Sequence, residues 1–78
     1  MTPTEEKVVQ TLREIFRAKG ETPPPLSESS PVDHSLGLDS LDFAELAVRL
    51  EDQYGRDPFS EGEVPPLRTV ADLAKLYE

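Results

Sequence analysis

The stretch from Leu36 to Gly55, LGLDSLDFAELAVRLEDQYG, decides the fold of this chain. It leads from a loop rich in proline and serine into a strongly patterned helix, which we predict over residues 40–54. Asp39 can cap this helix, Asp42 stands at its third position, and Gly55 ends it. One apolar face of the helix must contact the core, and it consists of Phe43, Leu46, Ala47, Leu50 and Tyr54.

The same helix carries a second apolar strip, made of Leu41, Ala44 and Val48. Glu45 and Asp52 flank the strip on one side, and Glu51 lies on the other. A helix that only packed against a core would not need a second strip framed by carboxylates. Two interpretations therefore stay open: a docking surface for other proteins, or a strip buried beneath the long loop.

The remaining pattern predicts an all-α bundle of three to four helices in one domain, residues 1–78. Thr2-Pro3-Thr4-Glu5 starts a helix over residues 3–19, and Thr69-Val70-Ala71-Asp72 starts the last one. Residues 20–38 are predicted to be a long loop without regular structure, and Gly62, Pro65 and Pro66 leave room for only a short or irregular third helix. The long loop has four candidate core anchors: Leu26, Val32, Leu36 and Leu38.

Composition narrows the class of partners. The net charge is −8, from 8 basic and 16 acidic residues, which disfavours nucleic acid and anionic membranes and favours partners with basic patches. No apolar run approaches the roughly 20 residues that span a bilayer, and the first residues do not form a secretory signal. The chain has no cysteine, which fits a reducing compartment. We expect a cytoplasmic monomer.

Ser40 is the most informative side chain, and the sequence offers few residues that could activate it as a nucleophile. The only histidine is His34, in the loop, so a hydrolase built on these two residues lacks its third group. A calcium loop starting at Asp33 fails, because Leu38 and Ala44 stand where it needs glycine and glutamate. An exposed serine at a helix start suits a phosphate or phosphodiester, because the first turn presents unpaired N–H groups. The local pattern alone, however, favours Ser40 as a simple helix cap.

The segment from Leu36 to Gly55 resembles the acyl carrier protein family. The family's attachment signature is matched by Asp39-Ser40-Leu41-Asp42, and the match continues through Glu45-Leu46 and Leu50-Glu51-Asp52. The order of the other elements agrees, so the resemblance covers nearly the whole chain. It implies a noncatalytic carrier on which a phosphopantetheinyl transferase attaches 4′-phosphopantetheine to Ser40. The prosthetic arm would supply the thiol that the chain lacks.

The resemblance also implies a docking face for the transferase and for acyl-loading and acyl-processing enzymes with basic patches. Its positions in this chain are Asp39, Leu41, Asp42, Ala44, Glu45, Val48 and Asp52.

Three features depart from the family pattern: Ser35 before the Leu-Gly pair, the interrupted third helix, and Arg49 within the second helix. They favour a specialised pathway, such as polyketide or modified-lipid synthesis, over general fatty-acid supply. Two alternatives remain: an aminoacyl or peptidyl carrier, and an acidic helical adaptor that binds a basic protein with Ser40 as cap or phosphosite.

Overall fold

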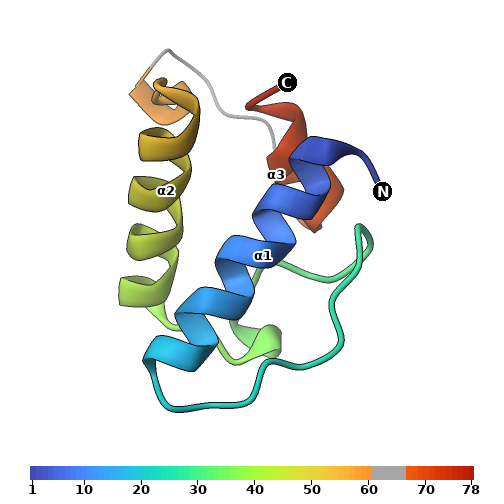
Figure 1. Cartoon of the computed structure of the whole chain (residues 1–78), viewed down its shortest axis with the longest axis vertical. Coiled ribbons are helices and arrows are strands. Elements are labelled where there is room, and N and C mark those ends of the chain that lie inside the picture. The colour runs from blue at the N-terminus through green and yellow to red at the C-terminus, as the bar shows by residue number, and fades with distance from the viewer. Residues whose placement is uncertain (61–66) are drawn as a thin grey trace.

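The computed structural model describes residues 1–60 and 67–78, and within them it contains three α-helices and two single-turn 3-10 helices. The α-helices are α1 (Pro3–Ala18), α2 (Ser40–Tyr54) and α3 (Val70–Lys75). The short helices are η1 (His34–Leu36) and η2 (Pro58–Ser60). The predicted all-α architecture is confirmed, and α1 packs against both α2 and α3 (Figure 1).

The two long helices form for the reasons that the sequence indicated. Thr2 and Glu5 make a capping box at the start of α1, in which each side chain accepts a hydrogen bond from the other residue's backbone N–H. The helix ends one residue earlier than predicted, because Lys19 serves as its C-cap. Gly55 ends α2 in the left-handed conformation, with φ 66°, which glycine adopts without steric cost.

The core lies where the three helices meet, and residues far apart in sequence fill it. Its fully or nearly fully buried side chains are Val8, Val9, Leu12, Ile15, Phe16, Leu38, Leu46, Leu50, Val70, Leu73, Ala74 and Tyr77. All four predicted loop anchors reach this core: Leu38 is buried, and Leu26, Val32 and Leu36 pack against it half-buried. The long loop is therefore held down along its length.

The loop is more regular than predicted. Asp33 caps η1 within it, and the backbone of residues 28–32 runs beside the start of α3. Ser30 O accepts from Val70 N at 3.0 Å, and Glu28 O accepts from Ala71 N at 2.9 Å. These carbonyls satisfy N–H groups in the first turn of α3, which a helix cannot pair internally. The predicted long loop is confirmed, and the expectation of no regular structure in residues 20–38 was wrong only at η1.

In the described residues, three polar contacts tie α2 to α1 or its cap, and two of them lie toward the ends of α2. Gln53 Nε2 donates to Thr11 Oγ1 at 3.0 Å, and the buried Thr11 hydroxyl donates to Lys7 O at 2.7 Å. At the other end, Lys19 Nζ donates to Asp42 Oδ2 at 2.7 Å. The helix that begins at Ser40 is thereby fixed to α1 over most of its length. The short third element is η2, and the interruption predicted at Gly62, Pro65 and Pro66 lies outside the described residues.

Candidate functional site

Ser40 is the first residue of α2 and is exposed. The cap of the helix is Asp39, whose Oδ1 accepts from Asp42 N at 2.9 Å, while Asp42 Oδ2 accepts from Asp39 N at 3.0 Å. The interpretation of Ser40 as the cap was therefore wrong, because the neighbouring carboxylate takes that role. Within the described chain, the Ser40 hydroxyl has no hydrogen-bond partner, so it is left available for chemistry.

The backbone around Ser40 fits a phosphodiester. In the part of the chain that the structure describes, no acceptor is paired with the N–H groups of Ser40 and Leu41 at the start of α2. Unpaired N–H groups and the positive end of the helix dipole favour an anion at this position. A phosphate carried on the exposed hydroxyl of Ser40 would lie beside both groups. The residues present therefore fit covalently attached 4′-phosphopantetheine.

His34 supports the site and does not activate its serine. Its Nδ1 donates to Leu38 O at 2.8 Å, and its ring meets the edge of Phe43 at a centroid distance of 5.6 Å. No hydrogen bond joins His34 to Ser40 in the described residues. His34 is therefore packed and hydrogen-bonded locally, and within the described residues it is not placed as the base that a serine hydrolase needs.

Asp42 is mostly covered, unlike the other acids of the predicted docking face. Its side chain is 11% exposed and accepts from both Lys19 Nζ and Asp39 N. The hydrogen bond from Lys19, with that from the Asp39 backbone, holds the pKa of the Asp42 carboxyl below its ordinary value of 3.8. The same contact with Asp42 raises the pKa of Lys19. Asp42 thus stabilises the start of the helix, and any role in docking stays a prediction.

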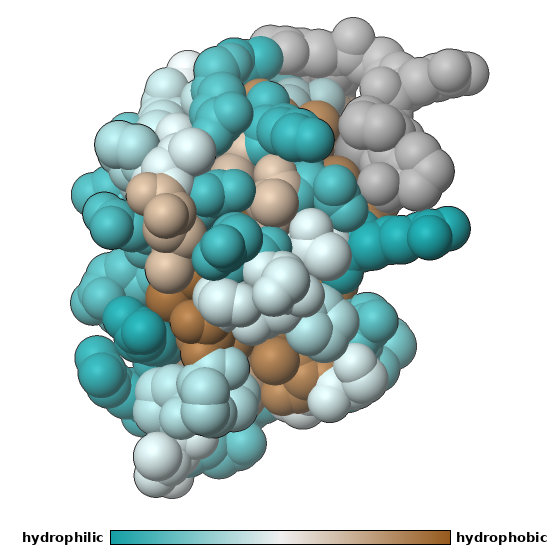
Figure 2. Space-filling view, turned by 90° about the vertical axis from the view of Figure 1, so that its right-hand side faces the viewer, coloured by the Kyte–Doolittle hydropathy of each residue, from teal (hydrophilic) through white to brown (hydrophobic). Residues whose placement is uncertain are grey.

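The second apolar strip of α2 is exposed, so it is not buried beneath the long loop, and its use as a docking surface stays a prediction. Leu41 is 80% exposed and Val48 57%, and Ala44 between them is also exposed. The long loop does not cover these residues. Figure 2 shows a different side of the molecule, viewed from the right of Figure 1, where hydrophilic side chains dominate and apolar ones appear in gaps between them.

The acids beside the strip differ in their surroundings. Glu45 Oε1 accepts from Arg49 Nε at 2.8 Å, and the same arginine reaches Glu14 Oε2 on α1 at 3.3 Å. Arg49 therefore offsets part of the acidic charge on this side of α2. Asp52 is exposed and has no ion-pair partner in the described part of the chain. Among the predicted docking residues, Leu41, Ala44, Glu45, Val48 and Asp52 all face solvent on α2, and Asp39 is exposed at its start.

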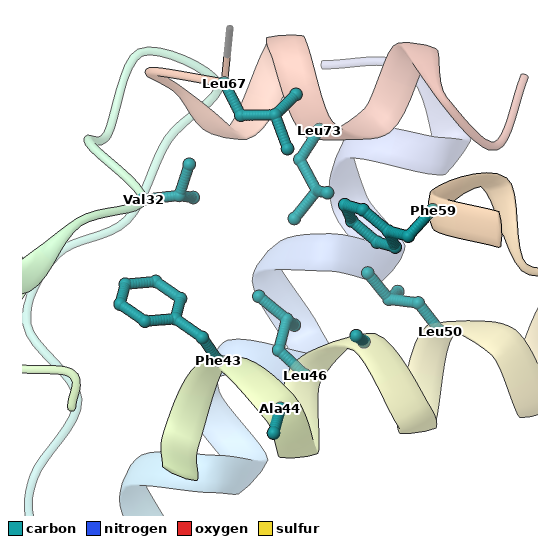
Figure 3. Close-up of a pocket in the computed structure, with 9 residues that line it drawn as sticks. Val32, Phe43, Ala44, Leu46, Leu50, Phe59, Leu67 and Leu73 are labelled. Carbon is teal, nitrogen blue, oxygen red and sulfur yellow. The ribbon is translucent and has the colours of Figure 1, made fainter. Parts of the chain in front are cut away.

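An apolar pocket of about 310 Å³ opens beside α2 (Figure 3). Its lining comes from the long loop, α2, η2 and the region of α3: Val32, Phe43, Ala44, Leu46, Ala47, Leu50, Phe59, Leu67 and Leu73. Phe43 and Ala44 lie about one helical turn beyond Ser40. This volume is at the lower end of the range for small-molecule pockets. The sequence showed the apolar face of α2 but not that a space remains next to it.

The sequence did not predict the contacts of Lys19 and Glu14, because their partners, Asp42 and Arg49, lie on another helix. The only sequence signal for Lys19 was the position of Asp42 within the capping box, which indicated a structural acid but not its cation. No local pattern pairs Arg49 with Glu14.

Comparisons with known proteins agree with this geometry. The family model described as "Phosphopantetheine attachment site" matches residues 6–76. An acyl carrier protein of Chlamydia muridarum (strain MoPn / Nigg) is 39% identical over 59 residues, which is 76% of this chain and 75% of the relative. The chain therefore belongs to the acyl carrier protein family, whose members are noncatalytic carriers with covalently attached 4′-phosphopantetheine.

A solved structure shows the same fold. The solution structure of MacpD, an acyl carrier protein from Pseudomonas fluorescens involved in mupirocin biosynthesis, matches with a TM-score of 0.76 at 37% identity. The match covers 94% of this chain and 66% of that one, so this chain spans just under two thirds of its length. None of the helices in the described residues is long and apolar enough to cross a membrane.

Proposed function

We propose that Ser40 carries the prosthetic group and that this domain presents acyl intermediates to the enzymes of a biosynthetic pathway. The observation that carries the proposal is the exposed, unpartnered hydroxyl at the first position of α2, inside the family's attachment signature. A phosphopantetheinyl transferase would join the Ser40 oxygen to the pantetheine-bearing phosphorus of coenzyme A, and the bond from that phosphorus to the bridging oxygen of the pyrophosphate would break. Adenosine 3′,5′-bisphosphate would leave, and the serine proton would pass to a base of the transferase. Once attached, 4′-phosphopantetheine supplies the thiol that holds acyl groups as thioesters.

The outer face of α2 is the docking surface in this proposal. Leu41 and Val48 offer apolar contact, and Asp52 offers a charge that no residue in the described chain neutralises. Exposed acids steer basic partners and raise the association rate, while a short apolar strip adds contact without tight binding. A carrier has to leave each enzyme quickly, so a weak interface suits it. Asp42 acts indirectly, because its carboxylate is bound to Lys19.

The cargo that suits the structure best is an apolar acyl group in a specialised pathway. The pocket beside α2 is lined by apolar side chains and begins about a turn from Ser40, within reach of a tethered chain. Two departures from the family pattern, Ser35 and Arg49, support a dedicated carrier. So does the likeness to a protein whose title places it in mupirocin biosynthesis. We place this carrier in the cytoplasm.

The pocket's role can be measured by loading the holo-protein with acetyl or octanoyl groups. We expect a higher melting temperature with octanoyl, because burying a longer chain removes more apolar surface from water. Ala47→Phe should fill the pocket and abolish this difference, whereas Ala18→Phe on the exposed side of α1 should preserve it. Equal melting temperatures for the two cargoes in the unmutated protein would contradict the pocket assignment.

Intact mass tests the attachment. Incubation with coenzyme A and a broad-specificity phosphopantetheinyl transferase should add one phosphopantetheine to the wild-type protein and to Ser35→Ala, and none to Ser40→Ala. Because Asp39 and not Ser40 caps α2, Ser40→Ala should change stability by no more than about 0.5 kcal/mol. Modification that persists in Ser40→Ala, or maps to Ser35, would overturn the assignment. A wild-type chain that the transferase never modifies would favour the adaptor.

A further inference from the structure

The Lys19 side chain donates hydrogen bonds to one residue before Ser40 and to one residue after it. It is the C-cap of α1, and its Nζ lies 3.2 Å from Gly37 O and 2.7 Å from Asp42 Oδ2. Gly37 precedes Ser40 in the loop, and Asp42 follows it in the first turn of α2. One ammonium group from another helix therefore joins the last part of the loop to the helix start.

The surroundings make this contact stronger than an ordinary surface ion pair. The Lys19 side chain is 26% exposed and that of Asp42 only 11%, and Lys19 Nζ also lies 5.7 Å from the centre of the Phe16 ring. Glu21, at 3.5 Å, adds a second carboxylate near the ammonium. Partly covered charges are screened less by water and salt than exposed ones. Removing Lys19 would leave a nearly buried carboxylate without its cation, which is a costly arrangement.

The backbone from Gly37 to Asp42 begins with a conformationally permissive glycine, which the contact with Lys19 helps to restrain. Gly37 has a φ of 98°, a left-handed conformation that glycine enters and leaves easily. Gly37 N donates to His34 O at 3.0 Å, and Leu38 is buried in the core. The contact of Lys19 with the Gly37 carbonyl therefore adds a further restraint just before Asp39 and Ser40. The same oxygen of Asp42 that binds Lys19 also accepts from Asp39 N, so the lysine and the capping box act on one group.

We propose that Lys19 is a positioning residue for the modification of Ser40, holding the loop end and the first turn of α2 so that the hydroxyl meets the transferase in one orientation. The proposal rests on the function proposed above. Lys19 touches neither the hydroxyl nor the transferred group in this arrangement. Its effect should therefore fall on the turnover of the bound complex and not on docking, because the exposed strip of α2 keeps its residues.

The test is a saturation series of the transferase reaction, followed by intact mass, that compares the wild-type protein with two variants at Lys19 and one control variant. Lys19→Met should lower kcat by about tenfold or more, since small misplacements of a reacting group cost this much, and should leave KM for this protein within about twofold. Lys19→Arg should recover much of the rate, because it restores a cation with hydrogen-bond donors. Arg17→Met removes an exposed positive charge from the same turn of α1 and should behave as wild type.

A second variant keeps the test decisive if Lys19→Met fails to fold. Asp42→Asn preserves an oxygen for Asp39 N but loses the charge that binds Lys19, so it should reproduce the loss of kcat. The double variant should lose no more than Lys19→Met alone, because that variant already lacks the contact between Lys19 and Asp42. Wild-type kcat in folded Lys19→Met or in Asp42→Asn, or an effect confined to KM, would overturn the positioning role. A wild-type protein that is not modified at all would instead overturn the proposed function.

Discussion

Leu50 and Leu41 lie on the same helix and meet opposite surroundings. Leu50 belongs to the inner apolar face of α2 and is 0% exposed, packed in the core with residues of α1 and α3. Leu41 belongs to the outer apolar strip and is 80% exposed. Both faces contain small and branched apolar residues at helical spacing, so the presence of such residues alone does not tell the two faces apart. The described structure shows a partner for the inner face only.

In the function that we propose, apolar side chains on this one helix have two separate uses. Burial of the inner face contributes to folding, because it removes apolar area from water. The outer strip gains nothing of this kind while it is exposed, and its flanking acids give it the composition of a docking surface. Stability and partner recognition should therefore respond to different substitutions in α2.

The largest expected effect comes from shortening the inner face. Leu50→Ala should lower the free energy of unfolding by about 2–5 kcal/mol, because it removes buried methyl groups and leaves a cavity beside an existing pocket. Urea unfolding monitored by circular dichroism measures this loss. In conditions where the variant remains folded, its modification by the transferase should keep the wild-type rate. A loss of stability below about 1 kcal/mol would show that the inner face is not the main support of α2.

Truncation of a leucine to alanine on the outer strip should preserve stability and slow the transferase reaction. Leu41→Ala should change stability by no more than about 0.5 kcal/mol, because the side chain is already in water. It should lower kcat/KM for the transferase by about tenfold, the loss expected when a central contact worth a little over 1 kcal/mol is truncated. Leu41→Ala and Leu50→Ala serve as controls for each other. Wild-type kinetics in Leu41→Ala would remove the outer strip from the docking surface.

A smaller effect is expected from charge on the docking surface. Asp52→Lys should slow the transferase reaction at low salt, and the difference from wild type should shrink as salt increases, because exposed charges are screened over about 8 Å at physiological ionic strength. Asp52 suits this test because it is exposed and has no ion-pair partner in the described residues. Glu28→Lys makes the same charge change in the long loop and should have little effect. Equal slowing by both variants would point to net charge and not to a docking face.

The smallest effect concerns self-repulsion among the acids of α2. Two of these acids are already compensated, because Lys19 neutralises Asp42 and Arg49 bonds to Glu45. Repulsion is therefore concentrated near Asp52, and Asp52→Lys should stabilise the fold by at most about 0.5 kcal/mol. Thermal melts should show a slight rise for this variant, and added salt should raise the wild-type melting temperature more than that of the variant. A flat response to salt together with an unchanged variant would show that the acids are already compensated.

The sequence predicted the bounds and the inner face of α2 because the signals for them are local. Asp39, Asp42 and Gly55 mark its ends through capping and a left-handed turn, and the spacing of Leu46 and Leu50 marks its inner face. It could not predict contacts between distant segments. Lys19 with Asp42, and the carbonyls of Ser30 and Glu28 with the start of α3, depend on how the loop is folded over the bundle. The sequence could not predict that the outer strip is exposed, because its exposure depends on the path that the long loop takes.

The most direct test of this account is a titration of the 15N-labelled protein with the transferase, followed by amide chemical shifts. The account predicts that shift changes concentrate on Ser40 and along the outer strip from Leu41 through Val48 to Asp52. Amides near Leu12 and other buried core positions should change little. Shift changes confined to the exposed side of α1 or to α3, with the outer strip of α2 unaffected, would contradict the claim that this strip is where the carrier meets its enzymes.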